Sequence, residues 1–241
     1  MQENCLGNEI AKLERYYRDQ GIHPLDFRCE FHSICSDGCE NFTEAKSSLI
    51  GSNYGARGLP RLVVLSADPG RGWSEPAART LESIRSRHDS LDLETAPKNN
   101  HWYQTHELAA SILGEFESDM DAESAAGHFA HVNAAKCSQN KHGKKQADSK
   151  LFRNCRRYLR GELAILKPDI IVSQGGAAGN ALDRTVDGIQ THKFEECAIV
   201  RFGQREAFWL RLHHPKARGG VYQVQKQRWP VFNSLIRAWV R

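Results

Sequence analysis

The sequence predicts an α/β protein, a three-layer α/β/α sandwich around a short and mostly parallel sheet. Four short apolar runs, each closed by turn residues, have the length and composition of buried strands. Stretches with apolar residues at helical spacing separate these runs, and such alternation is typical of a parallel sheet covered on both faces. The chain of 241 residues, 40% of them hydrophobic, is large enough for one packed domain over 1–241.

The first predicted strand, over 61–66, shows the strand pattern most clearly. Its Leu and Val residues lie between Pro60 and the turn Asp68-Pro69-Gly70, and such punctuation is typical of a buried strand that ends sharply. The other three strands are expected at 128–134, 169–174 and 207–213.

Helices are expected before, between and after these strands. A helix over 6–17 leads into a loop rich in Cys, Ser, Gly and Asp over 29–41, so residues 1–45 form an N-terminal helix and ligand loop. No internal repeat divides the chain, which favours a single domain. The remaining helices are expected near 75–88, 101–115, 148–166, 177–183 and 222–239.

The apolar runs and the start of the chain argue against membrane and secreted proteins. Apolar runs such as 62–65 fall far short of the ~18 residues that a membrane span needs. The first residues show no basic segment followed by an apolar one, so we expect a cytoplasmic protein with no membrane partner. The sequence shows no exposed apolar patch for an oligomer, and we expect a monomer.

Charge is sorted along the chain although the net charge is only +4. Residues 136–160 hold nine Lys and Arg and one acid, and residues 201–241 hold the same numbers. By contrast, residues 107–124 hold six acids and neither Lys nor Arg. The two basic segments could form one surface that faces phosphates, or they could simply solvate exposed helix faces.

Seven cysteines in a reducing compartment favour metal binding or inert burial over disulfides. Four thiolates hold either an iron–sulfur cluster or a zinc ion, and spacing alone does not choose between these two. The cysteines lie at 5, 29, 35, 39, 137, 155 and 197.

Polar residues with possible chemical roles stand at the ends of three of the four predicted strands. Asp68 follows the first strand, Asn133 ends the second and His214 follows the fourth. Ligands of parallel α/β sheets bind beyond the carboxyl ends of the strands, so these side chains are expected to converge at one rim.

A glycine-rich turn over 175–179 follows the third strand and raises the alternative of a dinucleotide site. Its spacing is not G-x-G-x-x-G, and the acid expected at the end of the following strand is missing, because Glu195 and Glu196 precede the apolar run 198–202. Close packing of a helix against the sheet is the better reason for these glycines.

The order of these motifs resembles the uracil-DNA glycosylase superfamily, and particularly its iron–sulfur branches, over residues 29–219. Asn133-Ala-Ala-Lys136-Cys137 is similar to the family-four element N-V-V-K-C, and Cys155 followed by the strand 168–175 is similar to that branch's second cluster cysteine and its P-x-I-I-V-x-L-G strand. His214-Pro215 resembles the shared H-P motif. Cys35-x3-Cys39 stands where the family has C-x2-C.

The resemblance implies a [4Fe–4S] cluster, with zinc as the alternative. Its ligands would be Cys35, Cys39, Cys137 and Cys155, and Cys29 stays open as a replacement for Cys35 because the C-x3-C spacing departs from the family. The cluster would pin the N-terminal loop to the basic segment 136–160.

The resemblance also implies roles for the rim residues in removing a base from DNA. Asp68 would orient the attacking water, as the Asp of the family-one motif G-Q-D-P-Y does, and His214 would hydrogen-bond the departing base. Asn133 would read the base edge, and Trp102, with Tyr103 as second choice, would stack on the base or else pack in the core.

Gly70 departs from the family-one motif, whose Tyr at this position walls off C5 of the base. With Ala67 and Gly70 lining the base site, a C5-modified pyrimidine of the phage type fits, although family four keeps uracil specificity with Gly at this position. Lys216 and Arg218 would contact DNA in the minor groove.

The sequence therefore predicts a monofunctional DNA glycosylase acting on a C5-modified pyrimidine, in defence against phage. Two alternatives within the same fold are a uracil repair glycosylase and an inactive DNA-binding member, and a zinc-stapled nucleotide-binding protein is a third. No lysine stands out as a Schiff-base nucleophile, so we expect base release without strand cleavage.

Overall fold

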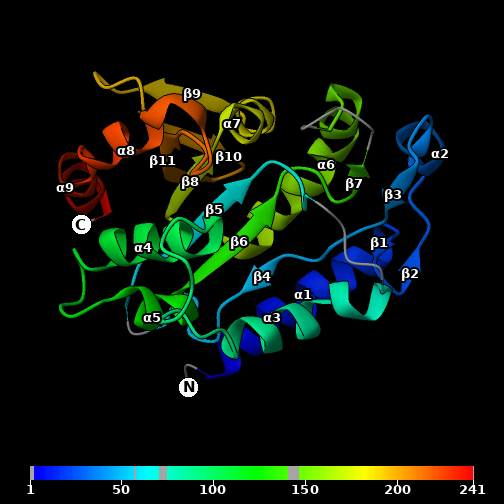
Figure 1. The fold of residues 1–241 in the computed structure, drawn as a ribbon, viewed down its shortest axis with the longest axis horizontal. Helices are drawn as coiled ribbons and strands as arrows, with labels where there is room; N and C mark the ends of the chain where they lie inside the picture. Colours follow the sequence, from blue (N-terminus) through cyan, green and yellow to red (C-terminus); the bar gives the residue numbers. More distant parts are fainter. Residues whose placement is uncertain (1–2, 57, 71–74, 141–146, 241) are drawn as a thin grey trace.

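A computed structural model describes residues 3–56, 58–70, 75–140 and 147–240 of the chain. Within these residues, helices lie on both sides of a seven-stranded sheet (Figure 1). The predicted α/β class with a mostly parallel sheet is therefore confirmed.

The centre of the sheet consists of four parallel strands. In the described residues the strand order is β4-β6-β5-β8-β11-β10-β9, and the pairs β6-β5, β5-β8 and β8-β11 are parallel. The two outer strands on one side and the single outer strand on the other run antiparallel to their neighbours. The central strands are β5 (Leu62–Ser66), β6 (Phe129–Asn133), β8 (Ile170–Gln174) and β11 (Arg205–Leu212); the outer ones are β4 (Leu49–Ile50), β10 (Cys197–Phe202) and β9 (Gly188–Thr191).

The central strands are apolar throughout because both faces of the sheet are covered. In β5, Val63 and Leu65 point into one core, whereas Leu62 and Val64 point into the other, and all four are fully buried. Burying such a side chain contributes roughly 1.5–3 kcal/mol, so the run that predicted the strand also anchors both layers.

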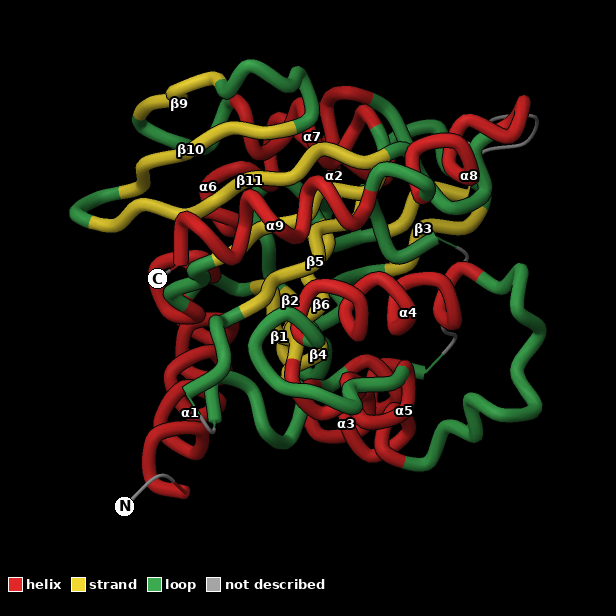
Figure 2. The backbone as a smooth tube through the Cα atoms, turned by 90° about the vertical axis from the view of Figure 1, so that its left-hand side faces the viewer, coloured by secondary structure: helices red, strands yellow, loops and turns green. Residues whose placement is uncertain are grey.

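One face of the sheet is covered by α1 (Glu3–Asp19), α6 (Ser149–Leu166) and α7 (Gly176–Asp183). Leu159 and Leu163 of α6 and Tyr17 of α1 are each buried in this core. The other face is covered by α3 (Leu81–Asp89), α4 (His101–Leu113), α8 (Val221–Lys226) and α9 (Trp229–Val240). Figure 2 shows α4 and α9 in front of the strands on this second face.

The predicted elements differ from the structure at two helices and one loop. The helix predicted over 75–88 is a short 3-10 turn (Pro76–Arg79) followed by α3, with Thr80 as the N-cap of α3. The helix predicted over 222–239 is two helices, α8 and α9. Pro230 has no N–H to donate, and inside a continuous helix its ring would clash with the preceding turn, whereas it is tolerated in the first turn of α9. The loop 29–41 contains a short helix, α2 (His32–Ser36).

The shorter elements mostly surround the N-terminal segment. Two hairpin strands follow α1, and β3 pairs antiparallel with β7, which follows β6. No helix in the described part of the chain is long and apolar enough to cross a membrane. The remaining elements are β1 (Ile22–His23), β2 (Asp26–Phe27), β3 (Asn41–Thr43), α5 (Ala122–Ala125), a 3-10 turn (Ala126–His128), β7 (Ser138–Asn140) and a 3-10 turn (Arg218–Gly220).

Candidate functional site

The carboxyl ends of the four parallel strands carry the residues that the sequence singled out. Asn133 ends β6 and pairs in register with Ser66, the last residue of β5. The backbone stays paired beyond the strands, since the N–H of Ala135 donates to the carbonyl of Ala67 at 2.8 Å. Asp68 therefore follows β5 directly beside the segment that follows Asn133, at the edge of the sheet where ligands of parallel sheets bind.

Asp68 lies half-buried in the turn after β5. Burial raises the pKa of its carboxyl above the ordinary value, and the backbone N–H groups of Asp68 and Gly70 oppose that shift by stabilising the carboxylate. Gly70 is exposed with φ of +70°, and a Cβ added there would meet no atom of the described residues within 4 Å. The turn thus presents a partly desolvated carboxylate next to open space.

His214 follows β11 at the same edge, two strands away from Asp68. Its Nδ1 accepts the backbone N–H of Lys216 at 3.0 Å, so a neutral ring carries its proton on Nε2. Burial, and then the charge of Lys216, lower the pKa of His214 and favour this neutral form. His213 also follows β11 but is exposed, whereas His214 stacks on His101, so His214 is the histidine held at the site.

Gly175 explains why the glycine-rich turn is needed beside His214. Its φ is +93°, a region that favours glycine, and an added Cβ would lie 3.3 Å from the Cβ of His214. The backbone after β8 thus packs directly against the histidine. A role in close packing, rather than phosphate binding, fits this geometry.

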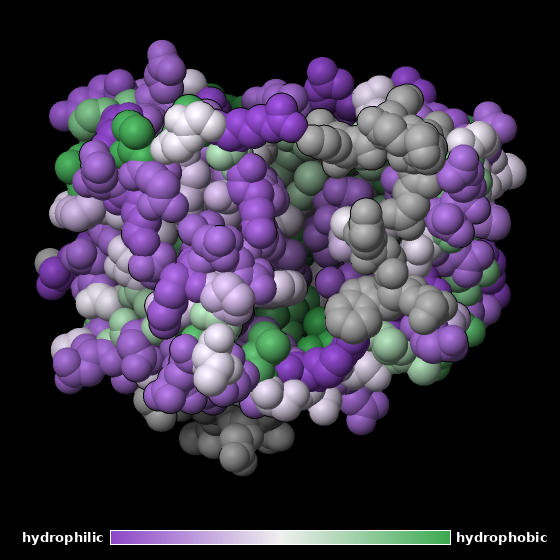
Figure 3. Space-filling model, viewed as in Figure 1, coloured by the Kyte–Doolittle hydropathy of each residue, from purple (hydrophilic) through white to green (hydrophobic). Residues whose placement is uncertain are grey.

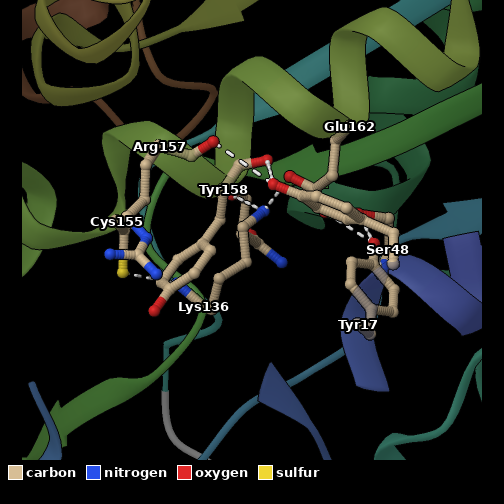
Figure 4. Close-up of polar contacts among 9 residues, drawn as sticks. Tyr17, Ser48, Lys136, Cys155, Arg157, Tyr158 and Glu162 are labelled. Atoms are coloured by element: carbon tan, nitrogen blue, oxygen red, sulfur yellow. Dashed lines mark hydrogen bonds and ion pairs between the residues drawn. The ribbon is translucent and has the colours of Figure 1, made fainter. Parts of the chain in front are cut away.

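Asn133 is 3% exposed, and its backbone carbonyl is held by Lys136, a buried lysine that Figure 4 shows beside Glu162. Lys136 donates its Nζ to the carbonyl of Asn133 and forms an ion pair with Glu162 of α6. Glu162 also accepts hydrogen bonds from Tyr17 Oη at 2.5 Å and Ser48 Oγ at 2.8 Å. A fully buried network thus fixes the end of β6 to α6 and α1.

Trp102 begins α4 and is half-buried. Its backbone N–H is capped by the side chain of Asn100 at 3.1 Å, and its ring lies 4.9 Å from the ring of His131 on β6. Part of the indole packs against the core on the α4 side of the sheet. The structure therefore places Trp102 between the core and the rim. Tyr103, the second choice for stacking, instead contacts Lys98, whose Nζ lies 4.2 Å from the Tyr103 ring centroid.

A group of buried histidines lies beneath the rim, and sequence reasoning missed it. His101 stacks on His214 with ring centroids 4.8 Å apart and planes 5° apart. His131 Nε2 lies 2.8 Å from Ser66 Oγ, and His106 Nε2 lies 2.8 Å from His88 Nε2. The signal was present, since His131 is a polar residue between the apolar residues Ala130 and Val132 of β6, but no spacing rule links it to His101.

Burial keeps these histidines neutral. It lowers the pKa of His101 and of His106 to about 4, with neighbouring cations and imidazoles adding to the effect on His101. The pKa of His131 falls well below its ordinary value for the same reason.

Lys216 and Arg218 lie in the exposed loop after His214. Gly219 and Gly220, which follow them, both have φ near +70° (75° and 69°), which shapes a tight turn at the start of α8. The loop thus offers two cations to solvent beside the rim. Figure 3 shows that this view of the molecule is hollowed near its centre, with apolar surface below a polar rim.

Four of the cysteines line one small cavity of about 10 Å³ between α6 and the N-terminal loop. Asn154 Nδ2 donates to Cys35 Sγ at 3.4 Å, and the backbone N–H of Lys136 donates to Cys155 Sγ at 3.4 Å. Cys39 does not line this cavity, whereas Cys29 does and lies 3.2 Å from Tyr158 Oη. The four cysteines are Cys29, Cys35, Cys137 and Cys155.

The donor set of this cavity fits a cluster or a zinc ion, and N–H donors to the sulfurs are typical of such sites. Burial, and then the neighbouring thiols, raise the pKa of Cys137 well above its ordinary value, so a bound cation would be needed to hold the thiolates together. As the described side chains stand, no three His, Cys, Asp or Glu residues form a group able to hold a metal ion.

Compared with known proteins, the chain matches no protein-family model and no curated protein.

Proposed function

We propose that this protein is a DNA N-glycosylase with a uracil-DNA glycosylase-like fold, in the iron–sulfur branch of that superfamily. The observation that carries the proposal is the edge of the parallel sheet, where Asp68, Asn133 and His214 follow three of its four central strands. A binding protein needs no such combination of a half-buried carboxylate, an amide and a neutral histidine. Hydrolysis of an N-glycosidic bond uses all three.

In the proposed reaction, a pyrimidine nucleotide leaves the stack and enters the site. Asp68 orients a water molecule toward C1′ and stabilises the positive charge that develops on the sugar as the bond to the base breaks. His214 donates its Nε2–H to O2 of the departing base, where negative charge develops. Water supplies the hydroxyl group of the abasic sugar, and the base leaves with a proton.

Asn133 reads the Watson–Crick edge of the base in this proposal. Its amide can donate and accept, so it suits uracil in one orientation and cytosine in the other. The open space beside Gly70 supports a substrate with a substituent at C5, such as a hydroxymethylated or glucosylated cytosine of phage DNA. Uracil remains the alternative substrate, for repair of deaminated cytosine.

Lys216 and Arg218 would contact DNA phosphates beside the rim, and the basic segments 136–160 and 201–241 would extend that surface. The cluster would be held by Cys29, Cys35, Cys137 and Cys155, because these four share one cavity, in place of the set with Cys39. Its part is structural, joining the N-terminal loop to α6, and hydrolysis needs no redox step.

The test is mass spectrometry of free bases released from two DNAs, one with uracil and one with a phage-type modified cytosine. Release of the modified base supports the glycosylase and its open C5 side. Release of uracil alone supports the repair enzyme. If the protein binds both DNAs and releases neither base, the glycosylase proposal is wrong and a binding role replaces it.

A further inference from the structure

Lys46 is a lysine at the rim that the reaction above does not use. It lies just before β4, and its backbone N–H donates to the carbonyl of Lys136 at 2.8 Å. This bond fixes the Lys46 segment beside the exit of β6, next to Asn133. The side chain of Lys46 is half-buried rather than extended into solvent.

The surroundings of the Lys46 amine are aromatic and cationic. Its Nζ lies 5.9 Å from the ring centroid of Trp102, whose ring in turn lies 4.9 Å from His131. Arg87, His101 and His131 also lie within electrostatic reach of Lys46. Among the described residues no acidic side chain forms an ion pair with it.

These surroundings increase the fraction of Lys46 present as the free amine. Burial, and then the charge of Arg87, lower the pKa of Lys46 to about 8. Desolvation and a neighbouring cation are the two ways in which proteins activate lysines for attack on carbonyl groups. By contrast, Lys136 is 1% exposed and paired with Glu162, and Lys216 is exposed to solvent.

We propose that Lys46 attacks the abasic site that base removal leaves, giving the protein a second activity as a DNA lyase. The inference rests on the proposed function only for the origin of the abasic site. The electrophile is the C1′ aldehyde of the ring-opened sugar. His101 links the two functions in space, because it stacks on His214 and lies within electrostatic reach of Lys46.

The steps balance without an oxidant or a reductant. Nζ bonds to C1′, the carbonyl oxygen leaves as water, and an imine forms. A neutral imidazole removes a proton from C2′, and the C3′–O bond breaks with the phosphate as leaving group. Water then hydrolyses the conjugated imine, which frees Lys46 and leaves an unsaturated aldehyde on one strand end and a 5′-phosphate on the other.

The experiment is reductive trapping with the full chain. A duplex with one natural abasic site is incubated with the protein and sodium cyanoborohydride, which converts an imine into a stable amine. A duplex with a tetrahydrofuran site is the control, since it has no aldehyde. We expect a covalent adduct with the first duplex alone, and peptide mass spectrometry should place it on Lys46.

Two variants complete the test. Lys46→Arg keeps the positive charge but forms no imine, so its adduct should be lost. Lys193→Arg is the matched control, because Lys193 is exposed with its Nζ 5.2 Å from the ring of Phe194, and its adduct should equal the wild-type yield. If Lys46→Arg fails to fold, the peptide map of the wild-type adduct decides alone.

Absence of an adduct, or an adduct on another lysine, would overturn the inference. The preformed abasic site separates this outcome from the proposed function. Base release without trapping leaves the glycosylase standing and rejects the lyase. Trapping without base release supports the lyase and rejects the glycosylase. A positive trap also replaces the expectation, drawn from the sequence, of base release without strand cleavage.

Discussion

The buried ion pair between Lys136 and Glu162 allows a quantitative prediction for Lys136→Met. The ammonium is 1% exposed and the carboxylate 0%, so solvent cannot compensate for either charge. The variant leaves Glu162 with only the hydroxyl groups of Tyr17 and Ser48 as donors within the described residues. An ionised carboxylate in that environment is incompletely satisfied.

The expected cost follows from the burial of both partners. Removing one member of a buried pair destabilises a protein by roughly 3–5 kcal/mol. In a chain of this size each kcal/mol lowers the melting temperature by about 2–4 °C, so we expect a decrease of roughly 6–20 °C. Differential scanning calorimetry measures this decrease directly.

A double variant separates the ion pair from simple packing. Glu162→Gln alone leaves the ammonium of Lys136 unpaired and should also destabilise the fold. Lys136→Met combined with Glu162→Gln removes both charges, so its loss should fall short of the sum of the single losses by about 0.5–3 kcal/mol.

Lys150→Met is the matched control, because Lys150 lies in α6, the helix that carries Glu162, and pairs with an exposed acid. Its Nζ lies 4.0 Å from Asp37, whose side chain is 83% exposed. Such a pair contributes less than about 1 kcal/mol. Equal melting of Lys136→Met and Lys150→Met, or fully additive losses in the double variant, would refute the reasoning.

Four further predictions test the site. Asp68→Asn should keep DNA affinity and lose release of the base, measured by binding and by mass spectrometry on the same sample; unimpaired release would remove Asp68 from the chemistry. Gly70→Tyr should block C5-substituted substrates more than uracil, and Gly70→Ala, which carries the same left-handed backbone strain of about 1–2 kcal/mol without a ring, should spare both. The pKa of His106 is about 4 in the folded protein, below the value of ~6.5 expected in the unfolded chain. Its contribution to the free energy of unfolding is therefore complete above pH 6.5 and is lost toward pH 4, by up to about 3 kcal/mol. Urea unfolding of His106→Phe should show a smaller decrease in the free energy of unfolding between pH 6.5 and pH 4 than the wild type does. After expression with iron, Cys29→Ser should lower bound iron and Cys39→Ser should not, by metal analysis of the purified proteins; the reverse result would restore Cys39 to the ligand set.

The central strands were predictable because each is buried on both faces and therefore apolar without interruption. The run 61–66 and the observed strand Leu62–Ser66 differ by one residue. The outer strands were harder to predict, because β9 and β4 are short and lie at the edges of the sheet, where pairing rather than composition defines them.

The residues at the strand ends were also predictable, because parallel strands bring their carboxyl ends to one edge whatever the connections between them. Asp68, Asn133 and His214 lie at that edge through topology alone. The sequence could likewise show that a cysteine set existed. It left Cys29 open only as a replacement for Cys35 and counted Cys39 as a ligand, whereas the cavity is lined by both Cys29 and Cys35 and not by Cys39. The distance of each cysteine from α6 depends on how their loop packs, which spacing does not show.

Only the tertiary structure decided what surrounds each polar group, and that environment determines its chemistry. The sequence alone does not distinguish the chemistry of Lys46, Lys136 and Lys216. Packing makes the first half-buried and unpaired with any acid among the described residues, the second fully buried in an ion pair, and the third exposed. The pKa and reactivity of a lysine follow from desolvation and nearby charge, which arise from contacts between segments far apart in the chain.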